Sequence, residues 1–559
     1  MKRTNLWIAG FLVGLWAVLF LPNLRTNPNW YGDEGEWMEK CWTFIHGTPR
    51  VGPIINDFVF PYPYPPLYML VNGTLLRVFG YDLVVGRALG AVTALGAAGL
   101  LFWIGCRLRD RTFGVLCATA FLVYAEANMN FRWVRSHPMA GTLALASVGF
   151  LVRYVQERRL RDALLAGLMC ALATATNYFT YPLIAMVAVT VLLTAPSNDL
   201  LPSGLAWRQR IVRAVLTALV AGSYGALFVG WYVLTHGWTE LMAQMGRLGA
   251  VAANEVRPTV WGEVQRFVMN VWNLGFRTPT KMTTQGLQGR DYWLVIATLG
   301  FVFLPVTKGK WLRLWMPVWL LVLMWGVFRK LNNVPLFFYP ATIFLPLMAV
   351  GLAGVLTWVG ELVARWEKNL RLVPAIVVLL LFGAASAQGA WERFESKIDL
   401  WTQHSVAEAE AAMKVANELC GGDDFMIVPK QIYWLARTER RSMLTFCARY
   451  NGVVNDMPVP VEIPREKYWF DCRLENARVV VMASGVDGSG RMPRGIDLVY
   501  CQGLKGVKEL VGQMVREGWP IVYHGGRQVA YAPIGDGISW PVAVDGEYIV
   551  LANPRFIRR

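Results

Sequence analysis

The sequence predicts an α-helical protein that crosses a membrane many times and carries a small α/β domain at its C-terminal end. Of its 559 residues, 55% are hydrophobic and 16% are charged, whereas soluble proteins carry about 25% charged residues. Up to about residue 390 the charges lie in short clusters between long apolar runs, and beyond it the composition becomes ordinary. We therefore expect a membrane region over 1–390 and a soluble domain over 391–559, a usual domain size.

The membrane region contains about eleven apolar segments, judged against the roughly 20 residues that a helix needs to cross a bilayer. No small-residue cleavage signal follows the first of them, so we expect it to remain as an uncleaved first span. The 25 Trp residues agree with a membrane protein, because Trp favours the membrane–water interface. The expected spans are 6–22, 86–106, 113–128, 138–155, 162–176, 179–195, 211–235, 292–306, 311–328, 335–358 and 371–389.

Short basic clusters indicate the orientation, because Lys and Arg concentrate in cytoplasmic loops. They occur at every second loop, which places them all on one side and, with eleven spans, the C-terminal domain on the other. We therefore expect a multi-pass protein of the cytoplasmic (inner) membrane with an extracytoplasmic C-terminal domain. The clusters are Lys2 and Arg3; Arg107, Arg109 and Arg111; Arg153, Arg158, Arg159 and Arg161; Arg208, Arg210 and Arg213; Lys308, Lys310 and Arg313; and Arg365, Lys368 and Arg371.

The net charge of +16 does not indicate a nucleic-acid partner. The topology accounts for the basic residues, and no nucleic-acid-binding module is present. The five histidines are scattered, so no metal motif is present either.

Two external segments, 23–85 and 236–291, are long enough to carry function. Within the first, 66–79 is weakly amphipathic and could lie at the membrane surface. In the C-terminal domain, strand-like runs cover 424–428, 478–483, 496–500 and 521–523, and a helix-like stretch covers 504–517. This alternation favours a small α/β domain.

Cysteines in the C-terminal domain agree with an oxidising compartment without requiring it. An even number there fits one or two disulfides, and buried thiols are the alternative. These cysteines are Cys420, Cys447, Cys472 and Cys501.

Adjacent acids at the membrane surface are the first candidates for chemistry. Asp33 and Glu34 follow the first span within Trp30-Tyr31-Gly32-Asp33-Glu34-Gly35-Glu36, where a carboxylate beside lipid is costly unless it has a partner or a task. The alternatives are a solvated loop, or a helix N-terminus capped by Asp33. With Glu36 they could also bind a divalent cation, but hard ions need more oxygen ligands than this run supplies.

An ordered series of motifs follows these acids. It runs through Tyr64-Pro65-Pro66-Leu67-Tyr68, Gly86-Arg87-Ala88-Leu89-Gly90, Arg132-Trp133-Val134-Arg135-Ser136-His137, Asn177-Tyr178 and Phe338-Tyr339-Pro340. In this order and spacing, roughly residues 1–390 resemble the GT-C glycosyltransferases of the protein-mannosyltransferase and aminoarabinose-transferase type, glycosyltransferase family 39 and its relatives. The resemblance implies a polyprenyl-monophosphate sugar donor. The sequence itself shows no requirement for a metal or another cofactor.

Individual positions carry the resemblance further. Asp33 falls where the family keeps its catalytic acid, and Glu34 where many members have a second. Three sites depart from the family pattern: Tyr64 replaces a Lys that can contact the donor phosphate, His137 replaces an acid, and Asn177-Tyr178 replaces a Lys-Gly pair. Another cation would therefore have to hold the phosphate.

The implied reaction is an inverting displacement at the anomeric carbon by an acceptor hydroxyl, with Asp33 as general base. Cations must hold the phosphate, and Arg suits this by bidentate donation. Arg135 is the preferred candidate and Arg87 could instead be structural; each cation alone could also simply reach lipid headgroups. The cations on the predicted external side are Arg87, Arg132, Arg135, Arg277, Lys281, Arg290, Arg329 and Lys330.

Two other functions stay open at this point. A transporter or lipid flippase would place ionisable residues in its spans and often shows inverted repeats; here the spans are nearly free of acids, apart from Glu126, and show no repeat. A non-catalytic scaffold that presents the external domain is the third possibility. The sugar, a hexose or a pentose, and the acceptor, a protein, a lipid or a glycan, do not follow from the sequence.

Overall fold

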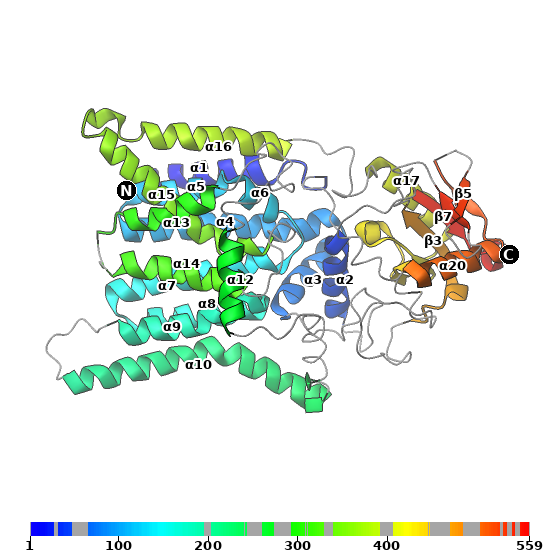
Figure 1. The fold of residues 1–559 in the computed structure, drawn as a ribbon, viewed down its shortest axis with the longest axis horizontal. Helices are drawn as coiled ribbons and strands as arrows, with labels where there is room; N and C mark the ends of the chain where they lie inside the picture. The colour runs from blue at the N-terminus through cyan, green and yellow to red at the C-terminus, as the bar shows by residue number, and fades with distance from the viewer. Residues whose placement is uncertain are drawn as a thin grey trace.

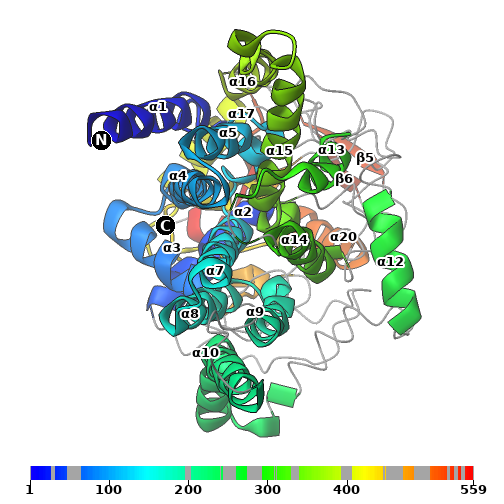
Figure 2. The same ribbon diagram turned by 90° about the vertical axis from the view of Figure 1, so that its left-hand side faces the viewer.

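A bundle of roughly parallel helices forms one end of the molecule and a small sheet domain forms the other in the computed structural model (Figure 1). The model describes residues 2–26, 32–46, 65–194, 203–239, 241–242, 260–272, 292–307, 309, 311–328, 339–391, 406–444, 447, 470–483, 504–525, 529–533, 539–542 and 548–557. Viewed along the bundle, α4 and α7 lie near its centre, and α1, α10 and α16 lie towards its outside (Figure 2).

Each of the expected spans falls on a helix of this bundle, although the ends differ by several residues. The helices are α1 (Lys2–Phe20), α4 (Leu83–Leu108), α5 (Arg111–Leu122), α7 (Ser136–Glu157), α8 (Leu160–Thr176), α9 (Pro182–Leu193), α10 (Ser203–His236), α13 (Tyr292–Gly300), α14 (Leu312–Phe328), α15 (Leu345–Val363) and α16 (Val373–Trp391). Short 3₁₀ turns adjoin them: η1 (Tyr178–Thr180), η3 (Phe301–Phe303), η5 (Tyr339–Ile343) and η6 (Lys368–Leu370).

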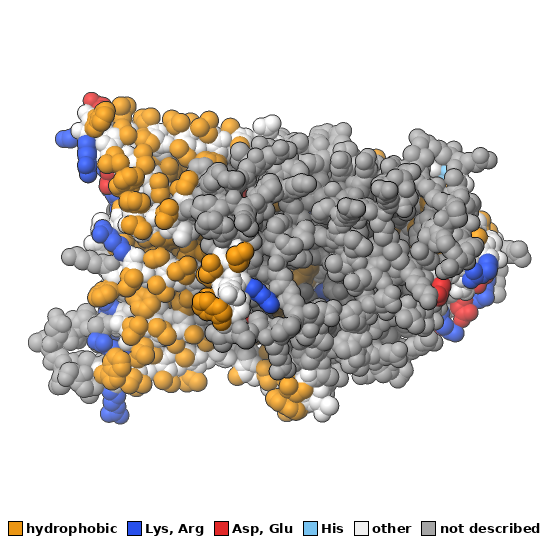
Figure 3. Space-filling model, in the orientation of Figure 1, with side chains coloured by type: hydrophobic (Ala, Val, Ile, Leu, Met, Phe, Trp, Pro, Cys, Tyr) orange, Lys and Arg blue, Asp and Glu red, His pale blue; other side chains and the backbone are white. Residues whose placement is uncertain are grey.

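The bundle belongs in a membrane. Within the described residues, 5 helices are long and apolar enough to cross a bilayer, with shorter apolar helices beside them. Large apolar side chains on the outer helices point away from the protein, among them Leu227 at 72% exposure and Leu381 at 67%. Hydrophobic side chains cover most of the described surface on the bundle face that Figure 3 shows. Lipid is the solvent in which such a surface is stable. The protein is therefore a multi-pass membrane protein, while the number of eleven crossings stays a prediction.

Basic clusters that are far apart in sequence meet at the bundle end that points away from the sheet domain, which we call the basic end. There Arg109 Nη1 lies 2.7 Å from Glu361 Oε1 and Arg371 Nη2 lies 3.3 Å from the same oxygen. Arg213 donates to the carbonyl of Arg158 at 2.8 Å. This convergence is what the positive-inside pattern predicts for loops on one side.

Four further helices do not belong to the expected spans as separate elements. They are α2 (Gly32–His46), α3 (Leu67–Phe79), the short α6 (Ala125–Asn130) and α12 (Val260–Trp272). α3 coincides with the segment predicted to lie at the interface. α12 runs across the direction of the spans (Figure 1) and exposes Trp261, Val268 and Met269.

The C-terminal domain contains a mixed five-stranded sheet in the order β2-β1-β3-β7-β4 and a separate β5-β6 hairpin. β1 pairs in parallel with β2 and β3, whereas β7 pairs antiparallel with β3 and β4. The small α/β domain is thus confirmed, and the predicted run 496–500 lies outside the described residues. Its elements are α17 (Val406–Leu419), β1 (Phe425–Ile427), η7 (Lys430–Leu435), β2 (Arg441–Ser442), η9 (Leu474–Asn476), β3 (Ala477–Ala483), α20 (Leu504–Arg516), β4 (Ile521–Tyr523), β5 (Ala530–Pro533), β6 (Ser539–Val542), β7 (Tyr548–Ala552) and α21 (Pro554–Ile557).

The structure describes three of the four cysteines for which disulfides or buried thiols were expected. Cys420, Cys447 and Cys472 are thiols in this structure, and the Cys447 thiol lies 3.2 Å from the carbonyl oxygen of Cys472. Cys501 lies outside the described residues. The described part of the domain therefore agrees with the buried-thiol alternative.

Candidate active site

The candidate site lies where the N-terminal turn of α2 meets α4 and the segment that joins α6 to α7. Asp33 is in that turn, but its side chain lies outside the described residues, as does that of Glu36. Glu34, the next residue, is described and is 1% exposed. The contacts of Glu34 therefore show where the turn that contains Asp33 lies in the fold.

Glu34 forms a buried, bidentate ion pair with Arg87 of α4. Arg87 Nη2 lies 2.6 Å from Glu34 Oε2 and Arg87 Nε lies 2.9 Å from Oε1, and neither side chain is more than 2% exposed. Arg87 Nη1 also donates to the carbonyl of Leu24 at 2.9 Å. The pair thus joins α2 to α4 and to the end of the first span.

Glu34 also holds the segment 131–137, which carries two of the predicted cations, Arg132 and Arg135. The backbone N–H of Val134 donates to Glu34 Oε1 at 3.0 Å. α4 approaches this segment closely because Gly90 has no side chain: a Cβ there would lie 2.2 Å from the carbonyl oxygen of Phe131. From the other side, Asn177 donates to the hydroxyl of Ser136 at 2.9 Å.

Arg132 is a fully buried cation. Its Nη2 donates to the carbonyl of Pro22, and its Nη1 lies 3.5 Å from Asn128 Oδ1, but its Nε has no hydrogen-bond partner. Burial, aided by the nearby guanidinium of Arg87, lowers the pKa of Arg132 to about 9, so the side chain is still charged at neutral pH. Among the described residues it forms no ion pair.

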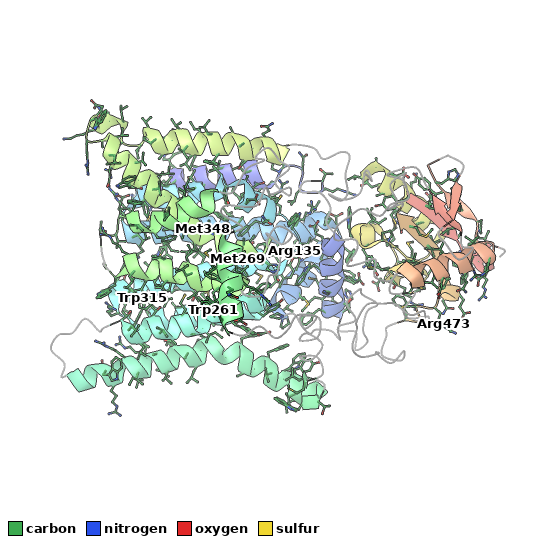
Figure 4. All side chains as sticks on the ribbon, viewed as in Figure 1. Arg135, Trp261, Met269, Trp315, Met348 and Arg473 are labelled. Atoms are coloured by element: carbon green, nitrogen blue, oxygen red, sulfur yellow. The ribbon has the colours of Figure 1, made fainter. Side chains whose placement is uncertain are left out.

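Arg135 adds a second buried positive charge to the segment, at 3% exposure. Its guanidinium carbon lies 5.9 Å from the centre of the Trp133 ring. It lies at the end of the bundle that faces α2 and the C-terminal domain (Figure 4).

Tyr68 of α3 completes the described site, and the sequence interpretation did not single it out. Its hydroxyl accepts a hydrogen bond from Asn72 at 3.0 Å. Burial, with the thiol of Cys41 and the carboxylate of Glu34, raises the pKa of Tyr68, and Arg135 opposes that shift. Tyr68 therefore stays protonated and lies within electrostatic reach of both Glu34 and Arg135. Only its place in Tyr64-Pro65-Pro66-Leu67-Tyr68 could have drawn attention to it.

The structure thus brings together four of the predicted site residues: Glu34, Arg87, Arg132 and Arg135. The geometry favours the structural alternative for Arg87, because Glu34 and a backbone carbonyl occupy its donors. The remaining predicted cations lie outside the described residues: Arg277, Lys281, Arg290, Arg329 and Lys330. Within the described residues no three His, Cys, Asp or Glu side chains gather into a metal site, and a cation at Glu34 would have to compete with Arg87.

Comparison with solved structures places this arrangement in a known fold. The structure of ArnT from Cupriavidus metallidurans bound to undecaprenyl phosphate superposes with a TM-score of 0.53 over 99% of this chain and 98% of ArnT, at 14% sequence identity. The oligosaccharyltransferase of Archaeoglobus fulgidus in its apo form gives a TM-score of 0.51 over 99% of this chain and 89% of its own, at 11% identity. This chain has the GT-C fold.

The GT-C fold confirms the fold class that the ordered motifs implied. Apo ArnT matches similarly, with a TM-score of 0.50 and 12% identity over 99% of this chain and 98% of ArnT. Neither a protein-family model nor a curated protein matches the sequence. At these identities the likeness establishes the GT-C fold alone.

Proposed function

We propose that this protein is a membrane glycosyltransferase that moves a sugar from a polyprenyl-monophosphate donor to an acceptor hydroxyl at the external membrane face. The observation that carries the proposal is the position of α2: its first turn, which contains Asp33, is anchored through Glu34 to a segment with two buried arginines. A carboxylate and positive charge are what displacement of a phosphate leaving group requires.

Buried positive charge gathers in the described part of the site. Glu34 is matched to Arg87, while Arg132 and Arg135 are buried beside them. Burying a charge is costly, and Arg132 forms no ion pair among the described residues, so an anionic ligand beside it would offset that cost. A phosphate monoester fits, because arginine binds it through charge-assisted and often bidentate hydrogen bonds.

A polyprenyl phosphate supplies such a group on a lipid chain that a membrane-embedded site can accommodate. ArnT, which shares the fold, was solved with undecaprenyl phosphate bound, and this supports the same donor class here. We assign the donor phosphate to Arg132 and Arg135, with Lys281, Arg329 and Lys330 as further candidates. For Glu34 and Arg87, expected as a second acid and as a phosphate ligand or a structural residue, we propose the structural role of holding α2 in place.

The reaction follows from these parts. The acceptor oxygen attacks the anomeric carbon while the bond from that carbon to the phosphate oxygen breaks, which inverts the configuration. The bonding electron pair leaves with the polyprenyl phosphate, whose charge the arginines stabilise. Asp33 takes the acceptor proton, a step that contributes typically 10²–10⁴-fold.

The decisive experiment compares Asp33→Asn with Asp82→Asn in sugar transfer from a radiolabelled polyprenyl-phosphate donor. Asp82 is a second acid of the same external segment and caps α4, accepting from the N–H of Val84 at 2.8 Å; Asn caps helices equally well. We expect Asp33→Asn to lose about 100-fold or more in kcat and Asp82→Asn to retain activity. Full transfer by Asp33→Asn would contradict the proposal, and donor uptake into sealed vesicles without transfer would favour a transporter.

The proposed function also includes the location of the protein and the classes of its sugar and acceptor. We place the protein in the cytoplasmic membrane, with the basic end in the cytoplasm and the C-terminal domain outside. The transferred sugar is a hexose or a pentose, and the acceptor is a protein, a lipid or a glycan that reaches the external face.

A further inference from the structure

A second buried ion pair joins the same helix to the C-terminal domain. Arg441 of β2 places Nη2 2.7 Å and Nε 2.8 Å from Glu39 Oε2 on α2. The two side chains are 3% and 5% exposed. The pair spans 402 positions in sequence, so it fastens a helix of the first external segment to a domain that is folded from the far end of the chain.

Arg441 is fixed on its own side of this contact. Its Nη1 donates to the carbonyls of Ala436 at 3.0 Å and Thr438 at 3.2 Å. Its guanidinium carbon lies 4.1 Å from the centre of the Tyr81 ring, a cation–π arrangement, and the Tyr81 hydroxyl donates to Glu39 Oε2 at 3.0 Å. Although burial works against its charge, Glu39 raises the pKa of Arg441, so the guanidinium stays charged.

Apolar packing surrounds the pair on both sides. Trp37, Met38 and Cys41 of α2 belong to one buried cluster with Tyr433 and Trp434 of η7. On its other side α2 lies against α3, where a Cβ on Gly73 would fall 2.3 Å from the carbonyl oxygen of Cys41. α2 is therefore held between the bundle and the C-terminal domain, an arrangement in which the domain can set its position (Figure 1).

Glu34 and Glu39 fasten α2 to two different bodies. Glu34 binds the bundle through Arg87, and Glu39 binds the C-terminal domain through Arg441. Asp33 and Glu39 are six residues apart, which is roughly 9 Å along a helix. A shift of the helix at Glu39 is thus transmitted to the turn that holds Asp33.

We propose that Arg441 is a positioning residue: through Glu39 it lets the C-terminal domain hold α2, and so Asp33, in its working place against the 131–137 segment. This inference rests on the proposed role of Asp33 as general base. It gives the C-terminal domain a part in the reaction without requiring that the domain touch the substrate.

The structural half of the inference is tested on the full-length protein in lipid nanodiscs by amide hydrogen exchange. We expect Glu39→Gln and Arg441→Met each to speed exchange in α2 by about tenfold or more, because removing one partner leaves the other buried and unpaired. Exchange in β3 and β7 should not change. Arg440→Met is the matched control, since neighbouring Arg440 is exposed and 4.0 Å from Asp423. Unchanged exchange in α2, or equal acceleration in β3 and β7, would overturn the inference.

Kinetics test the functional half. We expect Glu39→Gln and Arg441→Met to lower kcat with little change in the donor KM, Arg441→Lys to restore part of kcat, and the double variant to be no worse than the poorer single variant. Additive losses, or a loss in KM alone, would overturn the positioning role. If the wild-type protein transferred no sugar at all, the proposed function would fail, while the exchange experiment would still decide whether Arg441 holds α2.

Discussion

Asp33 and Glu34 are neighbours in the first turn of α2, and we propose that they have different roles. Glu34 is buried and bidentate with Arg87, so it matches the behaviour of a structural ion pair. The sequence identified both acids as candidates. It could not assign a structural role to Glu34, because that role depends on Arg87, 53 positions away.

Replacing Glu34 by Ala tests the structural role of this residue. Removing one partner of a buried ion pair typically costs about 3–5 kcal/mol, so we expect Glu34→Ala to lower the free energy of unfolding by about that amount in SDS titrations of the purified protein. The matched control is Glu410→Ala, since the Arg25–Glu410 pair is 2.8 Å long but 45% and 43% exposed and should cost at most about 1 kcal/mol. Equal losses in the two variants would contradict the structural role of Glu34.

At the scale of elements, the contact between α4 and the 131–137 segment depends on glycine. The motif Gly86-Arg87-Ala88-Leu89-Gly90 puts Arg87 on the face that meets this segment and leaves no side chain at Gly90. The sequence contained the motif, but spacing alone could not show which neighbour the glycine approaches.

Gly90→Ala should therefore displace the segment that carries Arg132 and Arg135. We expect this variant to weaken polyprenyl-phosphate binding by about tenfold, since misplacing positioned groups by 1 Å can cost about 100-fold in rate. Gly99→Ala in the same helix is the control, because nothing lies within 4 Å of the added Cβ, and Ala favours the helix by about 1 kcal/mol. Microscale thermophoresis with a labelled polyprenyl phosphate measures both, and equal affinities would count against the packing argument.

Helices and strands were more predictable from the sequence than the tertiary contacts between them. Apolar runs located the bundle helices because length and composition alone decide whether a helix can span a bilayer. The strand-like runs around β1, β3 and β4 were also found, whereas α17, β2, β5, β6 and β7 were missed. The pairs Glu34–Arg87 and Glu39–Arg441 were not predictable, because each depends on tertiary contacts that one sequence does not encode in any periodicity.

For the whole molecule, we predict that the basic end and the C-terminal domain lie on opposite sides of the membrane. Single cysteines are introduced at Glu361, which lies at the basic end, and at Asp423 of the C-terminal domain, whose side chain is fully exposed. A membrane-impermeant maleimide added to intact spheroplasts should label Asp423→Cys at once and Glu361→Cys only after permeabilisation. Native Cys420 should contribute little, since burial, with Asp424, raises the pKa of its thiol to about 12 and the thiolate is the reactive form. The reverse labelling would overturn the orientation.

The proposed function requires that the buried arginines beside α2 receive the phosphate of a lipid-linked donor within reach of Asp33. A cryo-EM structure of the full-length protein with bound polyprenyl phosphate measures this directly. We predict phosphate density in hydrogen-bond contact with Arg132 or Arg135, and an Asp33 carboxylate that faces the same space. Phosphate density away from both arginines, with Asp33 pointing into bulk water, would contradict the claim.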